Sequence, residues 1–264
     1  MTRIIDFHTH AFPDELAQRA MAALHDGIEV QACLDGRLSS LLSSMDNAGV
    51  SASVICCIAT RPGQFDSILN WCIQVSSDRI IPFASIHPDD DNVDDKIQQI
   101  IDAGIKGVKL HPYYQDYIAD EDCAMQLYES LSKAGLIVVS HAGLDFAFDH
   151  DDRSSPERML NITEQFGDLK LVISHLGGWQ QWDQVEELII GKDVHLEISY
   201  SLQYLPADRA RKMILNHPAQ YVLFGTDSPW DDQALAAERL RQLDLPPERL
   251  DLILHKNAEV FLRI

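Results

Sequence analysis

The sequence predicts an α/β fold, a single domain over residues 1–264 in which eight parallel strands alternate with helices in a (β/α)8, or TIM, barrel. Three observations support this prediction. Eight short apolar runs recur along the chain, amphipathic segments separate them, and the 264-residue length suits one such barrel. An open doubly wound sheet is the alternative, but it would usually carry a glycine-rich turn after its first strand, where this chain has His8-Thr9-His10.

The expected strands are runs rich in Val, Ile, Leu and Phe. Most of them are nearly continuous apolar stretches, which is typical of parallel strands that are covered on both faces. They are Ile4–His8, Ser53–Ala59, Ile80–Ile86, Gly107–His111, Leu136–His141, Lys170–His175, Val194–Tyr200 and Tyr221–Asp227.

Helices are expected between these strands. Several of them stop at a glycine, a common helix end because glycine readily adopts the left-handed conformation, and Pro156 and Pro206 mark expected first turns. The segment Pro13–His25 is interpreted as an extra helix after the first strand, placed where it could cover the mouth of the barrel. The other predicted helices are Leu38–Ala48, Val93–Ala103, Glu121–Ala134, Ala207–Asn216, Gln233–Leu243 and Pro247–Leu262.

The composition narrows the classes of partner and compartment. The net charge of −20 disfavours binding to nucleic acid or to anionic lipid, both of which normally need a basic patch. No apolar run approaches the length of a membrane span, no signal peptide is evident, and the five cysteines form no spaced framework. These features predict a cytoplasmic protein that acts on a small molecule, and they leave open whether it is a homodimer.

Histidines and one aspartate recur at the carboxyl ends of the predicted strands, the face where barrel enzymes carry their active sites. They are His8 and His10 on the first strand, His111 on the fourth, His141 on the fifth, His175 on the sixth and Asp227 on the eighth. Polar strand caps would explain His8 and His10 alone equally well, but not this recurrence. Because residues two apart on a strand face the same way, His8 and His10 can both point to the barrel axis and hold a metal ion.

Four segments together resemble the amidohydrolase superfamily, and most closely its branch that contains aminocarboxymuconate-semialdehyde decarboxylase and related hydrolases. The resemblance runs from residue 4 to about residue 261, and Asn257-Ala258 followed by Phe261 is similar to the closing helix of that branch. The four segments are Asp6-Phe7-His8-Thr9-His10, Gly107-Val108-Lys109-Leu110-His111-Pro112, Ser174-His175-Leu176-Gly177-Gly178 and Gly225-Thr226-Asp227-Ser228-Pro229-Trp230.

The resemblance implies a mononuclear metal site. By position, one divalent ion, commonly zinc, would be bound by His8, His10, His141 and Asp227. His175 would lie close to the metal-activated water, and Asp227 would accept the proton of that water. These two residues are therefore the expected catalytic groups.

Four further residues are candidates for binding substrate. Lys109 shares a strand face with His111; some superfamily members carboxylate a lysine on this strand and bridge two metals with it, so a second metal ion is an alternative. The preferred interpretation is that Lys109 pairs with a carboxylate such as Glu197 or binds a substrate carboxylate. Arg153 could clamp a substrate carboxylate or remain in solvent, and Trp230 could wall the pocket or only pack there.

The expected activity is hydrolysis of a carboxylic ester, lactone or amide bond of a small molecule by metal-activated water. The same residues are expected in a metal-dependent non-oxidative decarboxylase, which is the alternative reaction. A binding protein that keeps the barrel without turnover is the alternative from another class.

Overall fold

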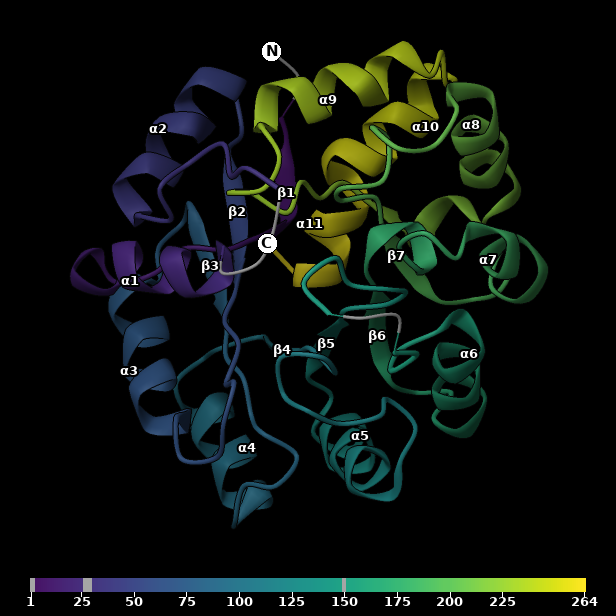
Figure 1. Cartoon of the computed structure of the whole chain (residues 1–264). Helices are drawn as coiled ribbons and strands as arrows, with labels where there is room; N and C mark the ends of the chain where they lie inside the picture. Colours follow the sequence, from purple (N-terminus) through teal and green to yellow (C-terminus); the bar gives the residue numbers. More distant parts are fainter. Residues whose placement is uncertain (1–2, 26–29, 149–150) are drawn as a thin grey trace.

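Eight short parallel strands form the centre of the computed structural model, which describes residues 3–25, 30–148 and 151–264. Helices surround the strands in Figure 1, and the predicted fold class is confirmed. The strands are β1 (Ile5–Thr9), β2 (Ala52–Cys56), β3 (Ile80–Phe83), β4 (Gly107–Leu110), β5 (Ile137–Ser140), β6 (Lys170–Ile173), β7 (His195–Glu197) and β8 (Val222–Leu223).

The strands follow one another in chain order, as a barrel requires. Parallel ladders join β1–β2–β3 and β4–β5–β6–β7–β8. Individual backbone hydrogen bonds link the two ladders at both seams. Ala84 N donates to Gly107 O (3.0 Å) beside β3 and β4, and Asp227 N donates to His8 O (2.7 Å) beside β8 and β1.

Most helices lie within one or two residues of their predicted bounds, but α3 and α7 were not predicted. Neither ends at a glycine, the signal that marked the ends of α2, α4 and α5. No helix among the described residues is long and apolar enough to cross a membrane. The helices are α1 (Asp14–His25), α2 (Leu38–Ala48), α3 (Phe65–Val75), α4 (Val93–Asp102), α5 (Asp122–Ala134), α6 (Pro156–Gln165), α7 (Trp182–Leu188), α8 (Ala207–Asn216), α9 (Gln233–Gln242), α10 (Pro247–Asp251) and α11 (Asn257–Leu262).

The predicted helix Pro247–Leu262 is interrupted by a π-helical turn, Leu252–Lys256, between α10 and α11. Short 3₁₀ turns, His175–Gly177 and Ala219–Tyr221, follow β6 and precede β8. Except for β1, which ends at Thr9, the strands also end one to four residues before the predicted ends. His175 (φ 59°) and Asp227 (φ 65°) adopt left-handed backbone conformations just beyond β6 and β8.

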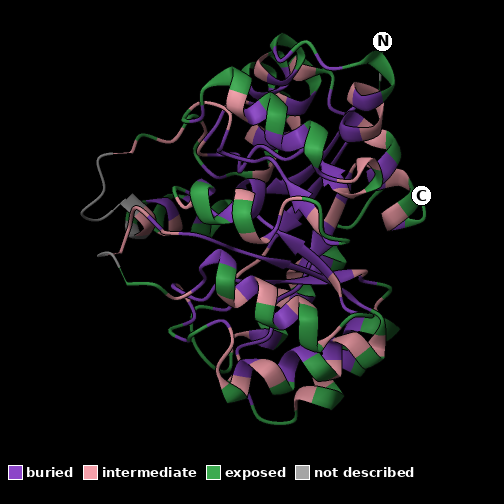
Figure 2. Cartoon of the chain, turned by 90° about the vertical axis from the view of Figure 1, so that its right-hand side faces the viewer, coloured by how far each residue is buried: buried purple, intermediate pink, exposed green. Residues whose placement is uncertain are grey.

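Two groups of apolar side chains form the core, and Figure 2 shows the strands as the most buried part of the chain. The larger group lies between the strands and the surrounding helices. The smaller one fills the barrel interior, where Phe7, Phe83 and Leu223 pack with Ala258 and Leu262 of α11. This apolar filling leaves only the carboxyl ends of the strands for a polar site.

The loop after β5 packs against the loop after β6 with no space between their backbones. Trp179 N donates to Ala142 O (2.9 Å), and Leu144 N donates to Trp179 O (3.0 Å). A Cβ atom on Gly143 would lie 2.0 Å from Trp179 N. This contact fixes the path of the chain directly after His141.

We predict that Gly143→Ala destabilises the protein far more than Gly191→Ala. The two glycines have nearly equal φ angles, +89° and +91°, but a Cβ on Gly191 would meet no atom within 4 Å. Gly191→Ala is therefore a control that introduces only the backbone strain. Gly143→Ala should lower the free energy of unfolding by about 2 kcal/mol more than this control does. Urea unfolding followed by circular dichroism measures both, and equal losses would contradict the steric argument.

Candidate metal centre and active site

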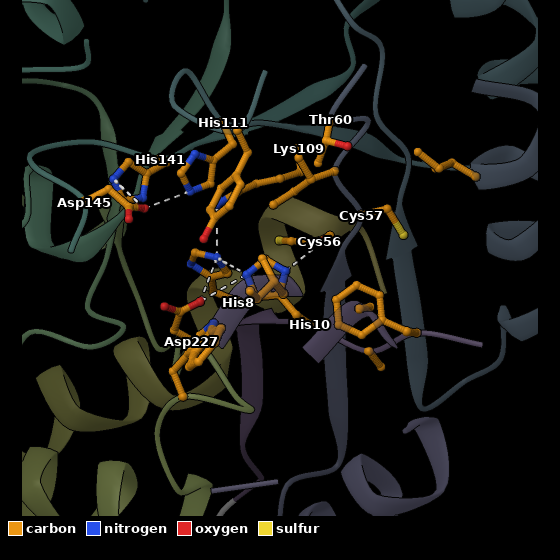
Figure 3. Close-up of a pocket in the computed structure, with 18 of the residues that line it drawn as sticks. His8, His10, Cys56, Cys57, Thr60, Lys109, His111, His141, Asp145 and Asp227 are labelled. Carbon is orange, nitrogen blue, oxygen red and sulfur yellow. Dashed lines mark hydrogen bonds and ion pairs between the residues drawn. The ribbon is translucent and has the colours of Figure 1, made fainter. Parts of the chain in front are cut away.

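One cavity of about 560 Å3 opens at the carboxyl ends of the strands. Its polar lining includes nearly all of the residues singled out from the sequence, and Figure 3 shows most of them facing the same space. They are His8, His10, Lys109, His111, His141, His175, Asp227 and Trp230. Arg153 does not belong to this lining: its guanidinium donates to Asp116 Oδ1 (2.6 Å) and Asp151 Oδ2 (2.7 Å).

Three of these side chains converge closely enough to hold a metal ion. His10 Nε2 lies 3.1 Å from Asp227 Oδ1, and His8 Nε2 lies 3.4 Å from the same oxygen. The two imidazole Nε2 atoms are 3.2 Å apart. His8, His10 and Asp227 thus form a compact set of two nitrogens and one carboxylate oxygen.

The hydrogen bonds of the outer imidazole nitrogens fix the direction of the inner lone pairs. His8 Nδ1 lies 2.9 Å from Glu197 Oε1, and His10 Nδ1 lies 2.8 Å from Cys56 O. Since a carboxylate and a carbonyl only accept, we assign the protons to the two Nδ1 atoms. Two Nε2 lone pairs then face each other, an arrangement that a cation between them stabilises, so these residues fit a divalent ion.

An irregularity in β1 places His8 toward this centre. The register with β2 shifts between Asp6 and Thr9, so that Phe7 joins the apolar filling while the next residue, His8, enters the polar layer. The buried Asp6 carboxylate accepts from His8 N (3.2 Å), Thr226 Oγ1 (2.6 Å) and Gln233 Nε2 (2.8 Å). Asp6 therefore holds the shifted segment against the chain beyond β8 and against α9.

His175 lies beside the three-residue set, with its own outer nitrogen satisfied. Its Nδ1 lies 3.1 Å from Ser199 O, so the proton belongs on Nδ1 and the Nε2 lone pair faces inward. Its backbone N–H donates to Glu197 Oε1 (3.0 Å). The expected catalytic residue is thus positioned by the same carboxylate that orients His8.

His141 is brought into the cavity but not into the same compact set. Its ring stacks on His111 with centroids 4.1 Å apart, and its Nδ1 lies 3.1 Å from His175 Nε2. His111, His141 and Asp145 form a second cluster of metal-ligand type. The assignment of His141 as a ligand of the first ion remains a prediction.

Burial and neighbouring charges set the protonation of the site. Burial lowers the pKa of His8, His141 and His175, so these imidazoles are neutral at pH 7. Burial also opposes ionisation of Asp227, but the adjacent His8 and His10 outweigh it and lower the pKa of that carboxyl to about 2. Neutral nitrogens and an ionised carboxylate are the protonation states that metal binding requires.

Several contributors to the site were not predicted. Asp145, on the loop after β5, faces His111 and His141, and burial raises the pKa of its carboxyl to about 6. Its position four residues after His141 was the available signal. Nothing in the sequence indicated the roles of Ser199 and the Cys56 carbonyl, or the hydrogen bond that His8 Nδ1 donates to Glu197. The sequence analysis considered Glu197 as a partner of Lys109 instead.

Comparison with protein families gives one match that spans nearly the whole chain. The amidohydrolase family model named Amidohydro_2 matches residues 5–264. A comparison with curated proteins found no match.

Solved structures of the same fold also cover the whole chain. An uncharacterized TIM-barrel protein from Bordetella bronchiseptica is 22% identical, with a TM-score of 0.74 and coverage of 99% of this chain and 98% of the other. A probable 2-pyrone-4,6-dicarboxylic acid hydrolase from Acinetobacter baumannii is 16% identical, with a TM-score of 0.69 and full coverage of both chains. A dihydroxybenzoic acid decarboxylase from Polaromonas sp. JS666, with bound manganese, is 12% identical, with a TM-score of 0.73 and coverage of 100% and 97%.

These likenesses establish the fold, and the family match over residues 5–264 establishes the relationship. The candidate metal ligands His8, His10 and Asp227 lie at the face of the barrel where this fold carries its chemistry. The chain belongs to the amidohydrolase family.

Proposed function

We propose that this protein is a metal-dependent hydrolase that cleaves a carboxylic ester, lactone or amide bond of a small molecule. The observation that carries the proposal is the convergence of His8, His10 and Asp227 in a cavity large enough for such a substrate. One divalent ion, proposed to be zinc, suits their two nitrogens and one carboxylate oxygen. When bound, such an ion lowers the pKa of water and polarises a carbonyl group.

The residues of the chain supply the remaining parts of the reaction. The ionised Asp227 carboxylate accepts a proton from the attacking water. His175 offers an inward Nε2 lone pair that accepts a hydrogen bond from the same water and orients it. Glu197 keeps both imidazoles in place through His8 Nδ1 and the His175 backbone.

Non-oxidative decarboxylation is the second candidate. A structural neighbour with bound manganese is named a dihydroxybenzoic acid decarboxylase, and another is named a probable hydrolase, so proteins of this fold carry names of both reactions. The two candidates use the same ligand set and differ in the fate of water. Hydrolysis adds water across a bond, whereas decarboxylation releases carbon dioxide.

We predict that the purified protein carries one divalent ion per chain, and that His8→Ala weakens its binding on the order of 100-fold or more, because a ligand nitrogen is lost. Inductively coupled plasma mass spectrometry after dialysis measures the metal content. His255→Ala is the control, since His255 lies outside the cavity in the π-helical turn. Metal binding that is unchanged in His8→Ala would refute the proposed centre.

We predict that Glu197→Gln lowers metal affinity by roughly 10- to 100-fold, because an amide orients His8 less well than a carboxylate does. Activity should recover in part at saturating metal. Competition with a chromogenic chelator gives the affinity, and Glu187→Gln, on the exposed face of α7, is the matched control. A normal affinity in Glu197→Gln would mean that this carboxylate does not tune the centre.

Turnover in ¹⁸O-labelled water separates the two reactions. With a panel of aryl esters, lactones and anilides, we expect one labelled oxygen in the carboxylate product and no carbon dioxide. His175→Asn should lower kcat by roughly 10²- to 10⁴-fold with an unchanged metal content, since a group that orients water is lost. Carbon dioxide release from aromatic acids without incorporation of the label would show that the reaction is decarboxylation and not hydrolysis.

A further inference from the structure

The hydroxyl of Ser199 lies between two imidazole rings of the site. Its Oγ accepts from His8 Nδ1 (3.1 Å) and from His175 Nδ1 (3.0 Å), and it donates to Glu197 Oε1 (2.9 Å). Ser199 follows shortly after β7 and is fully buried. Within the described part of the chain, it is the only side chain that contacts the Nδ1 atoms of both rings.

These three contacts match the hydrogen-bonding capacity of a serine hydroxyl, which has one proton to donate and two lone pairs that accept. Both imidazoles carry their proton on Nδ1, as assigned above, and the carboxylate of Glu197 only accepts. The hydroxyl therefore donates to Glu197 and accepts from His8 and His175. Its full capacity is used, so a single direction of the O–H bond satisfies all three neighbours.

A serine beside a histidine and a carboxylate is also the arrangement of a nucleophile, but Ser199 does not have this role. Its side chain is fully buried and does not belong to the cavity lining, so a substrate in the cavity does not contact it. The nitrogen that faces it on His175 is Nδ1, which already carries a proton and cannot take the proton of the hydroxyl. Ser199 therefore acts on the reaction only through the two imidazoles.

Each imidazole has a second acceptor besides this hydroxyl. His8 Nδ1 lies 2.9 Å from Glu197 Oε1, and His175 Nδ1 lies 3.1 Å from the carbonyl oxygen of Ser199 itself. These other bonds are enough to keep both protons on Nδ1. Loss of the hydroxyl would therefore leave the two tautomers in place and would remove the connection between the rings.

We propose that Ser199 is a positioning residue that ties the orientation of His175 to that of His8. The proposal rests on the proposed hydrolase function, in which His8 is a metal ligand and His175 orients the attacking water. The ring centroids of the two histidines are 5.4 Å apart, and the shared hydroxyl joins the rings through their outer nitrogens. An imidazole N–H held by two acceptors turns less freely than one held by a single acceptor. Ser199 thus narrows the range of directions in which His175 Nε2 points into the cavity.

A double-mutant cycle tests this role on the aryl ester, lactone or anilide that the wild type turns over. Ser199→Ala should lower kcat roughly 10-fold and change KM less than about twofold, since the orienting imidazole loses one hydrogen bond. In a His175→Asn background the same substitution should cause no further loss, because the imidazole through which it acts is absent. Ser201→Ala is the matched control: Ser201 is equally buried, and its hydroxyl donates to Ser199 O (2.9 Å).

A second measurement needs neither metal nor turnover. In the metal-free protein labelled with ¹⁵N-histidine, NMR detects the Nδ1–H groups of the buried imidazoles. Ser199→Ala should shift the signals of both His8 and His175, because both lose the same acceptor. Ser201→Ala should leave the His8 signal unchanged. Zinc affinity, measured by chelator competition, should change less than about threefold in Ser199→Ala, since His8 keeps its bond to Glu197.

Ser199→Cys guards against a folding defect in Ser199→Ala. It keeps a side chain of similar size and replaces the hydroxyl by a thiol, which is a weak acceptor. It should reproduce both the loss of kcat and the shifts of the two imidazole signals. Thermal unfolding followed by circular dichroism checks that each variant is folded.

Three results would overturn the inference. An unchanged kcat in Ser199→Ala would show that the hydroxyl does not orient His175. An equal loss of kcat in the wild-type and His175→Asn backgrounds would show that Ser199 does not act through this imidazole. A shift confined to one imidazole signal would show that the hydroxyl does not join the rings. Failure of the hydrolase proposal is distinguishable, since it shows as a lack of stoichiometric metal or of turnover, whereas the NMR measurement depends on neither.

Discussion

A single buried carboxylate, that of Glu197, holds the polar layer of this barrel together. It accepts from His8 on β1, from the backbone after β6 and from Ser199 after β7. It also depends on Gly225 after β8, where a Cβ would lie 2.3 Å from Glu197 Oε2. A buried carboxylate is stable only when donors satisfy its oxygens, so the ends of β1, β6, β7 and β8 depend on one another for their positions.

Three residues around this carboxylate have unfavourable backbone conformations. His175, Tyr200 and Asp227 all have positive φ angles and lie just beyond β6, β7 and β8. Such conformations are unfavourable for residues other than glycine and persist where the surrounding structure enforces them. Together with the irregular register of β1, they aim side chains at the centre that an ideal ladder would direct elsewhere.

The sequence was sufficient to predict the eight strands, their order and the convergence of His8, His10 and Asp227, because apolar runs and strand ends are local patterns. It was not sufficient to predict the division of the histidines, in which His8 and His10 lie with Asp227 while His111 and His141 lie with Asp145. His141 stacks on His111 and faces Asp145 because of ring rotations and of the path of one loop, which depend on contacts distant in sequence. Arg153 lies outside the cavity lining, because its guanidinium binds the nearby Asp151 and the more distant Asp116.

Helix α1 lies outside the regular alternation of strand and helix, since α2 is the helix that leads from β1 into β2. Its Leu16, Ala20 and Leu24 nevertheless form part of the cavity wall, while every residue of the metal-ligand set comes from the strand ends. This part of the cavity wall and the candidate metal ligands therefore come from separate stretches of the polypeptide. Exchange of this one helix therefore offers evolution, or a protein engineer, a route to a cavity of another shape that leaves His8, His10 and Asp227 in place.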